Sequence, residues 1–279
     1  MRLATLRLAG GGTTAVRLEG ETAVEIPGFA ELGELFAAEG WRERAASADG
    51  QRHEGVEPRS WAPPVLRPSK IVCVGLNYRN HILEMGRELP EFPTLFAKFP
   101  EALVGPFDPI VLPAHASEAV DWEGEVAVVL GATARRVDEE GARRAIAGFA
   151  VLNDVTMRDW QYRSPQWLQG KTFEATTPFG PWITVTEDAE LPTGAELRTE
   201  VDQELVQSTP VDDMVFGPAA LVAYVSQILT LHPGDVIATG TPGGVGHART
   251  PQRYLAPGQE LVTSISGLGE LRNDVLAES

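Results

Sequence analysis

The sequence predicts a mixed α+β fold dominated by strands. Short strand-like runs alternate with turns along much of the chain, as in KIVCVGL, EVAVVLG, PWITVTE, GDVIATG and QELVTSIS. One stretch shows convincing helical periodicity, and strands and helices do not alternate as they do in a doubly wound fold. The 279 residues, of which 43% are hydrophobic, suffice for one large domain or for two of ordinary size.

The first 57 residues predict a small unit of their own. The runs MRLATLRL and TTAVRLEG flank the glycines at 10–12 and favour a β-hairpin. The stretch GFAELGELFAAEG then favours a short amphipathic helix that ends at Gly40. No Gly-Lys-Ser/Thr follows the triple glycine, so we interpret it as a turn and not as a phosphate loop.

A proline-rich segment at 58–70, PRSWAPPVLRPSK, has the composition of an extended connector. We therefore expect a small N-terminal domain at 1–66 and a catalytic domain at 67–279. Within the second domain, GPAALVAYVSQILTLHPGD predicts the best-defined helix. Pro218 suits its first turn, apolar residues recur at helical spacing, and Pro233-Gly234 ends it.

Charge and cysteine content exclude several classes of protein. A net charge of −16 would repel phosphate backbones, so we expect no nucleic acid partner. No apolar run approaches the length of a membrane span, and the N-terminal residues lack the apolar core of a secretory signal, which predicts a cytoplasmic protein without membrane contact. The single cysteine, Cys73, excludes an internal disulfide, and its apolar surroundings predict a buried side chain.

Three acids form the first candidate site. In VDWEGEVAVVLG the side chains of Glu123 and Glu125 lie on the same face of a predicted strand, since strand side chains alternate. Asp154 directly follows a second strand-like run. Three carboxylates around one point suit Mg²⁺ or Mn²⁺ and would leave about three positions for water or substrate. A solvent-facing strand edge is the alternative for two acids alone.

The second candidate site lies in VGLNYRNHILEMGRELPEFP. His81 and Glu84 are three residues apart, so they share a face on one helical turn, and a carboxylate beside an imidazole suits a general base. We expect the other histidines, at 53, 115, 232 and 247, to be structural or solvated. Gly86 and the prolines at 90 and 93 favour a mobile lid over residues 79–95.

Two further segments carry polar candidates. Arg158 and Gln161 lie on one face of a short predicted helix, and Lys171 follows among aromatic residues and glycine, where it suits an anion or oxyanion partner. In GDVIATGTPGGVG the glycines expose backbone N–H groups, and Thr241 adds a hydroxyl that could help to grip a carboxylate. A tight structural turn is the alternative reading of this loop.

Taken together and in this order, these segments resemble the fumarylacetoacetate hydrolase family. The matching pieces cover residues 70–274 almost continuously: GLNYRNHILEMG, LFAKFP, VDWEGEVAVVLG, NDVTMRDWQ, QWLQGKTFEATTPFGPW, DDMVF, TLHPGDVIATGTPGGVG and SGLGELRN. The resemblance implies a mixed β-roll and a homodimer. The leading 66 residues are similar to the variable N-terminal domain of many bacterial members.

The resemblance also implies a role for each candidate residue. It implies divalent metal ligands (Mg²⁺ or Mn²⁺, with Ca²⁺ in some members) at Glu123, Glu125 and Asp154. It implies a general-base pair on the lid at His81 and Glu84, and an active-site lysine at Lys171. It implies substrate contacts at Arg158, Gln161 and Thr241.

Three departures from the family pattern bear on the substrate. Gly124 stands where a larger residue is usual, Phe99 stands where proline is often found, and Asp202-Gln203 replaces a common Asn-Gly. None removes a predicted ligand or base, but each could reshape the pocket.

The leading functional hypothesis is hydrolytic C–C cleavage of an acylpyruvate-like 2,4-dioxo acid through an enolate held at the metal. His81 would activate the water, and Lys171 and Gln161 would stabilise the oxyanion. The same site could instead serve an oxaloacetate decarboxylase or a hydratase or isomerase of an unsaturated 2-oxo acid. A non-catalytic metal-dependent binding protein is the alternative of another class.

Overall fold

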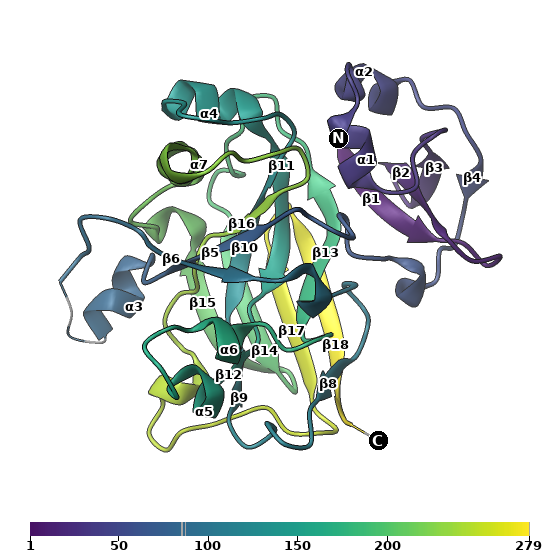
Figure 1. Cartoon of the computed structure of the whole chain (residues 1–279). Coiled ribbons are helices and arrows are strands. Elements are labelled where there is room, and N and C mark those ends of the chain that lie inside the picture. Colours follow the sequence, from purple (N-terminus) through teal and green to yellow (C-terminus); the bar gives the residue numbers. More distant parts are fainter. Residues whose placement is uncertain (85, 87, 279) are drawn as a thin grey trace.

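The computed structural model describes residues 1–84, 86 and 88–278, and Figure 1 shows its strands grouped at the centre with helices around them. In this described part, eleven strands join the largest sheet. Its order is β4 (Arg52–His53), β3 (Thr22–Glu25), β2 (Thr13–Glu19), β1 (Arg2–Arg7), β13 (Thr177–Thr184), β11 (Ile146–Asn153), β10 (Gly124–Leu130), β16 (Val236–Ala238), β5 (Ile71–Gly75) and β6 (Thr94–Lys98), with β7 (Leu103–Val104) paired to β13.

Two smaller sheets complete the strand content. One has the order β15 (Glu204–Pro210), β14 (Glu196–Val201), β17 (Glu260–Ile265), β18 (Gly269–Ala277) and β8 (Ile110–Leu112), and the other pairs β12 (Thr156–Met157) with β9 (Val120–Asp121). Parallel and antiparallel pairs occur in the same sheet, since β16 runs parallel to β5 and antiparallel to β10. The predicted α+β class with a mixed β-roll is confirmed.

The helices of the described residues are short. They are α1 (Leu32–Ala37), α2 (Trp41–Ala46), α3 (Arg79–Glu84), α4 (Glu139–Ala145), α5 (Arg158–Gln161), α6 (Leu168–Lys171) and α7 (Pro218–Ile228), with 3-10 turns η1 (Pro58–Ser60), η2 (Pro100–Ala102), η3 (Val211–Asp213) and η4 (Gly246–Ala248). The helix expected after Gly217 is therefore confirmed as α7, and α2 was not foreseen. No helix in the described part is long and apolar enough to cross a membrane.

The central strand β10 is buried along its whole length because both faces of the sheet are covered. Val126 and Val128 pack into a core shared with α4 and α7, whereas Ala127 and Val129 pack into a second core shared with α1 and β1. This alternation is what the period of a strand requires when both sides are apolar. The strand and its ends are consequently rigid supports for side chains.

The N-terminal segment extends the largest sheet. The expected hairpin forms from β1 and β2, and β1 then pairs with β13 at the registers Arg2↔Thr184 and Leu3↔Ile183. In Figure 1 this purple segment lies at one side of the molecule, next to β13. The proline-rich connector is packed and not solvated, with residues 62–65 buried. The division into domains at residue 67 stays a proposal.

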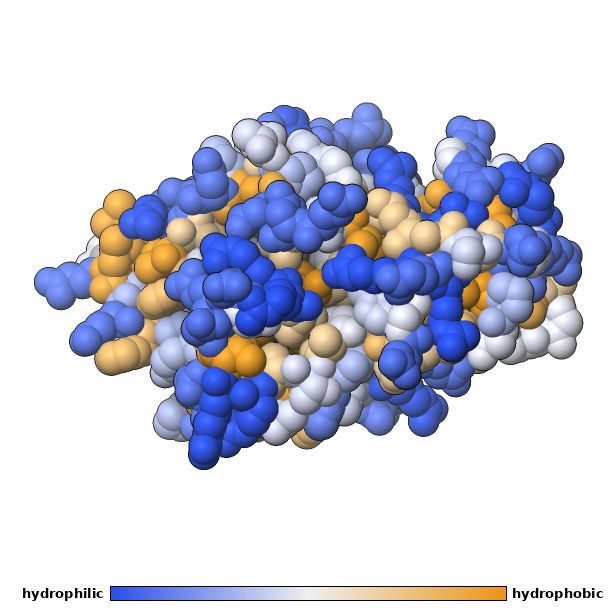
Figure 2. Space-filling view, turned by 90° about the horizontal axis from the view of Figure 1, so that it is seen from above, coloured by the Kyte–Doolittle hydropathy of each residue, from blue (hydrophilic) through white to orange (hydrophobic). Residues whose placement is uncertain are grey.

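The surface matches the acidic composition. Figure 2 shows that hydrophilic residues cover most of the face seen from above, with hydrophobic residues scattered between them.

Cys73 is fully buried in β5, as expected from its apolar run, and burial raises the pKa of its thiol well above the ordinary value.

Candidate functional site

The hairpin of β10 and β11 brings the three predicted acids together. Glu123 precedes β10, Glu125 is its second residue, and Asp154 follows the last residue of β11. The register pairs Gly124 with Asn153, and the backbone N–H of Asp154 donates to the carbonyl of Glu123 over 2.8 Å. One carboxylate oxygen from each of the three acids lies within 4.8 Å of the others, and all three residues are buried.

Neighbouring strands fix this arrangement. The side chain of Asn153 accepts from the N–H of Glu123 (3.0 Å) and donates to Thr263 in β17 (2.8 Å). The N–H of Gly240, just after β16, donates to Oε2 of Glu125 over 2.8 Å. The acids are therefore held by backbone and amide groups from three strands before any ligand arrives.

Buried cations neutralise the acids. The ammonium of Lys171 lies 2.7 Å from Oε2 of Glu123 and 2.8 Å from Oδ2 of Asp154. The ammonium of Lys98, at the end of β6, lies 2.6 Å from Oδ1 of Asp154, and neither side chain has exposed surface. Lys98 lies in the quoted LFAKFP segment, but sequence reasoning gave it no role.

A second residue missed by sequence reasoning, Asp121, completes the charge cluster. Its Oδ2 lies 2.7 Å from a terminal nitrogen of Arg158, which also contacts Oε1 of Glu123 at 2.7 Å. Burial alone would lower the pKa of Arg158, but Asp121 and Glu123 outweigh burial and raise it, so the guanidinium stays charged. Arg158 is therefore fixed between Asp121 and Glu123.

The pKa directions show how the cluster is balanced. Burial raises the pKa of Glu125 well above its ordinary value, and the charges of Asp154 and Glu123 raise it further. Burial acts in the same direction on Asp154, but Lys171 and Lys98 outweigh it and lower its pKa. Burial lowers the pKa of Lys171, but the charges of Asp154 and Glu123 outweigh burial and raise it.

The donor set fits a divalent cation. In the described part of the chain, four acids face three cations: Asp121, Glu123, Glu125 and Asp154 against Lys98, Arg158 and Lys171. One acid charge is left over. Oxygen donors alone suit hard ions such as Mg²⁺ and Mn²⁺, whose positive charge would offset it.

A cavity of about 540 Å³ reaches the acid cluster at Glu123. Six of the predicted site residues line it: His81, Glu123, Arg158, Gln161, Lys171 and Thr241. The Oε1 atom of Gln161 accepts from Arg158 over 2.9 Å, and the hydroxyl of Thr241 accepts from Gln207 over 2.9 Å. Sequence reasoning thus identified residues that the fold places around one space, although it had no way to place the walls between them.

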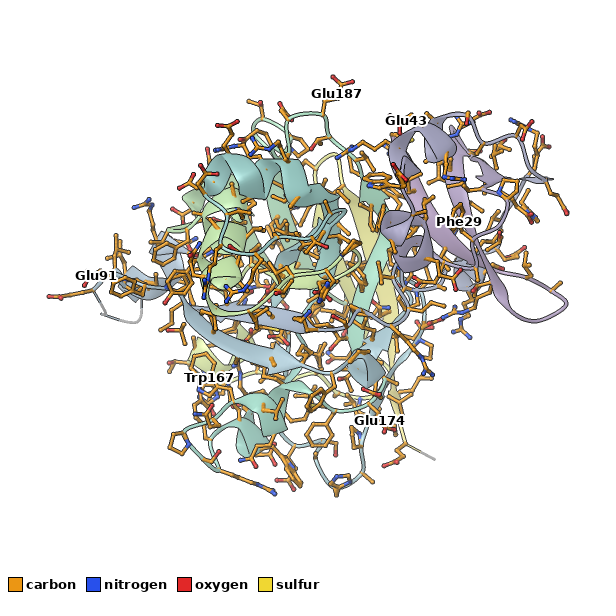
Figure 3. The ribbon with its side chains drawn as sticks, turned by 45° about the horizontal axis from the view of Figure 1, so that its top comes forward. Phe29, Glu43, Glu91, Trp167, Glu174 and Glu187 are labelled. Carbon is orange, nitrogen blue, oxygen red and sulfur yellow. The ribbon has the colours of Figure 1, made fainter. Side chains whose placement is uncertain are left out.

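The predicted base lies in the wall of this cavity. His81 belongs to α3 and is 8% exposed. The side chain of Glu84, its predicted partner, lies outside the described residues. Further along the expected lid, Glu91 points away from the body of the protein (Figure 3). The pairing of His81 with Glu84 and the closure of a lid over the cavity remain predictions.

Two wall residues were not foreseen. Trp167, labelled in Figure 3, packs edge-on against Phe96 with ring centroids 5.3 Å apart, and a Cβ on Gly75 would lie 2.4 Å from its ring. His247, which we expected to be structural or solvated, lines the cavity from η4. A glycine-rich loop gives no periodicity from which the position of His247 could be predicted.

Comparison with known proteins adds three findings. A family model described as fumarylacetoacetate (FAA) hydrolase C-terminal matches residues 70–276. The mitochondrial oxaloacetate tautomerase of Rattus norvegicus is 43% identical over 223 residues, which cover 78% of this chain and 71% of that protein. Two solved structures match over 100% of both chains.

Those two structures carry different functional names. The fumarylacetoacetate hydrolase of Exiguobacterium antarcticum has a TM-score of 0.88 at 34% identity. The 5-carboxymethyl-2-hydroxymuconate delta-isomerase of Mycobacterium smegmatis has a TM-score of 0.81 at 33% identity. One fold and one arrangement of the chain are thus found with hydrolase, isomerase and tautomerase names.

Proposed function

Because the chain belongs to the fumarylacetoacetate hydrolase family, we propose that it is a metal-dependent enzyme that enolises a 2-oxo acid. The observation that carries this proposal is the buried trio of Glu123, Glu125 and Asp154, of which Glu123 lines a cavity that His81 and Lys171 also line. Deprotonation next to a 2-oxo group needs electrostatic stabilisation of the oxygen and a base beside the carbon, and these groups supply both.

Glu123, Glu125 and Asp154 would hold the metal, for which we propose Mg²⁺ or Mn²⁺, with Ca²⁺ also compatible with an all-oxygen set. When bound, the ion supplies Lewis-acid stabilisation of the negative charge that develops on the 2-oxo oxygen.

The chain's own cations bind and orient the substrate. Arg158 and Gln161 are buried, and they are already hydrogen-bonded to each other, so little side-chain entropy is lost when they bind a carboxylate. Lys171 keeps its proton, since its pKa is raised, and its ammonium donates to the oxygen on which charge develops. The hydroxyl of Thr241, which also lines the cavity, adds a contact to the substrate carboxylate.

His81 performs the proton transfer. As a neutral imidazole it removes a proton from the carbon next to the 2-oxo group, and the imidazolium then returns a proton to the enolate. Glu84 would stabilise the imidazolium from the same helix. The aromatic side chains of Phe96 and Trp167 exclude water from this part of the cavity.

Tautomerisation or isomerisation is the outcome that we place first, because a relative at 43% identity is named an oxaloacetate tautomerase and a solved neighbour an isomerase. Hydrolytic C–C cleavage, the leading hypothesis from the sequence, is the second candidate, and the observation that favours it is the likeness to a fumarylacetoacetate hydrolase. Decarboxylation would follow from the same enolate. The homodimer that we propose also rests on the family likeness, and the cytoplasmic location stays a proposal from the sequence.

A panel of 2-oxo acids tests the proposal. Oxaloacetate keto–enol exchange, acylpyruvate cleavage and pyruvate release would be measured with Mg²⁺, with Mn²⁺ and with excess chelator. We expect activity on at least one substrate that requires metal, and its loss in Glu125→Gln while that variant stays folded. Glu174→Gln, an exposed acid near Lys171, is the matched control and should retain activity. Undiminished activity in chelator contradicts the proposal.

A further inference from the structure

His247 lies in the cavity wall with a hydrogen-bond arrangement that the proposed chemistry does not use. We propose that it determines substrate specificity, offering the lone pair of Nε2 to a hydroxyl on the part of a 2-oxo acid substrate that lies against η4. This inference rests on the proposed function and adds the substrate class, a 2-oxo acid with a hydroxyl away from its reacting end.

The backbone of η4 is fixed to the site. The N–H groups of Gly246 and His247 donate to the two oxygens of Asp121, over 2.7 Å and 3.0 Å. The same carboxylate holds Arg158. A Cβ on Gly246 would lie 1.8 Å from the carbonyl oxygen of Arg253, so the backbone of η4 packs closely here and only glycine fits. His247 is therefore held in register with Arg158.

Two neighbours determine which ring nitrogen of His247 carries the proton. The amide nitrogen of Gln252 lies 3.1 Å from the carbonyl oxygen of His247, which can only accept, so the Gln252 oxygen faces Tyr254. The Tyr254 hydroxyl has one hydrogen and donates it to that oxygen over 3.0 Å. In the arrangement that uses the two shorter contacts of this group, the Tyr254 oxygen accepts from Nδ1–H of His247 over 2.8 Å, and the 3.3 Å approach of the Gln252 amide nitrogen to Nδ1 is then not a hydrogen bond. This arrangement leaves Nε2 unprotonated.

The Nε2 atom is available to a ligand. Within the described residues, no hydrogen bond uses Nε2. Since Nε2 is not a fully buried atom, part of its surface is accessible. Tyr162 lies against the same ring, with centroids 5.1 Å apart. A substrate group that reaches this wall therefore meets an acceptor between aromatic surfaces.

The charges around His247 favour a neutral donor over a carboxylate. Burial lowers the pKa of His247, and Arg158 lowers it further against the smaller opposing effect of Asp121, so the ring is neutral at pH 7. The arginine and the lysine that line the cavity in the described part, Arg158 and Lys171, pair with acids of the proposed metal site and serve the 2-oxo acid end of the substrate. A second carboxylate at η4 would have no arginine or lysine of its own.

The test compares substrates that differ at one position. Para-hydroxy-, para-methyl- and para-carboxyphenylpyruvate would be compared by deuterium exchange at the carbon next to the 2-oxo group, with Mg²⁺ present. We expect kcat/KM for the hydroxy compound to exceed that for the methyl compound about tenfold or more, because the methyl group leaves the acceptor unpaired. The carboxy compound should be the poorest substrate.

Variants assign this preference to His247. In His247→Leu the ratio between hydroxy and methyl compounds should fall to about one, and any general loss of activity cancels in the ratio. Tyr254→Phe should reduce the ratio, since the proton on Nδ1 loses its acceptor. His115→Leu, a histidine that packs on Trp160 outside the cavity, should keep the wild-type ratio.

The possible failures are distinguishable. If no 2-oxo acid, including pyruvate, shows metal-dependent exchange, the proposed function itself fails. If pyruvate exchanges but the wild-type ratio is near one, if none of the aryl compounds reacts, or if the carboxy compound is preferred, the role of His247 is overturned while the proposed function stands. An unchanged ratio in His247→Leu overturns it as well.

Discussion

Replacing Lys98 by methionine tests whether the buried charges act as one cluster. The Lys98–Asp154 pair has no exposed surface on either side chain, and its two atoms are 2.6 Å apart. Methionine has a similar length and no charge, so the change leaves one oxygen of Asp154 buried without its cation. Removing one partner of a buried ion pair costs about 3–5 kcal/mol. We expect about 3 kcal/mol here, because Asp154 keeps Lys171.

The assay is urea unfolding in chelator and in Mg²⁺. An ion that binds only the folded state at a hundredfold excess over its Kd adds about 2.7 kcal/mol to the free energy of unfolding. In Lys98→Met the increment from Mg²⁺ should exceed that of the wild type, because the ion binds a more negative cluster. Metal should therefore recover part of the stability that the substitution removes.

Lys70→Met is the control for this experiment. The Lys70 ammonium lies 2.5 Å from Oδ2 of Asp235, which precedes β16, whereas Gly240, which contacts Glu125, lies after that strand. Asp235 also accepts from the N–H of His232 over 2.7 Å, and the Lys70 side chain is 27% exposed. Its Mg²⁺ increment should equal that of the wild type. A loss below about 1 kcal/mol for Lys98→Met in chelator, or equal increments in both variants, would refute the reasoning.

Three further predictions concern the base, a turn and the cysteine. His81→Ala should lower turnover about 10²–10⁴-fold with calorimetric metal affinity unchanged, and a parallel loss of metal binding would contradict its role as base. Gln203 has a φ of 67° in the two-residue turn between β14 and β15, so Gln203→Gly should raise the free energy of unfolding by about 0.5–1 kcal/mol in urea without altering activity. Destabilisation would show that the side chain of Gln203 matters more than its backbone strain. Cys73 should resist a colorimetric thiol reagent at pH 8, since its raised pKa keeps the thiol protonated, and should react once the protein is unfolded. Prompt reaction of the native protein would show that β5 opens.

The sequence allowed prediction of those strands whose residues are apolar on both faces. β5, β10, β13, β16 and β17 all lie where strand-like runs occur. The hairpin of β14 and β15 escaped prediction because its turn, Asp202-Gln203, lacks the glycine that marks the common two-residue hairpin turns. The continuity of β1 with β13 is a long-range pairing that no local pattern encodes.

The candidate site could be predicted in part for a similar reason. The positions of Glu123, Glu125 and Asp154 follow from strand alternation and from the ends of two successive strands, which are local properties. The location of Lys98 against Asp154 depends on how β6 reaches the sheet through β5, and that of His247 depends on the anchoring of η4 by Asp121. Such contacts join segments far apart in the chain, so composition and periodicity carry no information about them.

The hairpin of β10 and β11 supplies all three acids from one local unit, whereas the cavity walls come from other elements, among them α3, α5, α6, η4, β5 and β6. Apart from Arg158 and Lys171, which pair with the acids, wall residues can therefore change without altering the geometry of the acids, which depends on ladder hydrogen bonds inside the sheet. Such a separation makes the fold evolvable: a lineage can retain one activation chemistry while loops acquire different side chains. For enzyme engineering, the walls around Trp167 and His247 are the positions to randomise, and the hairpin is the part to leave unchanged.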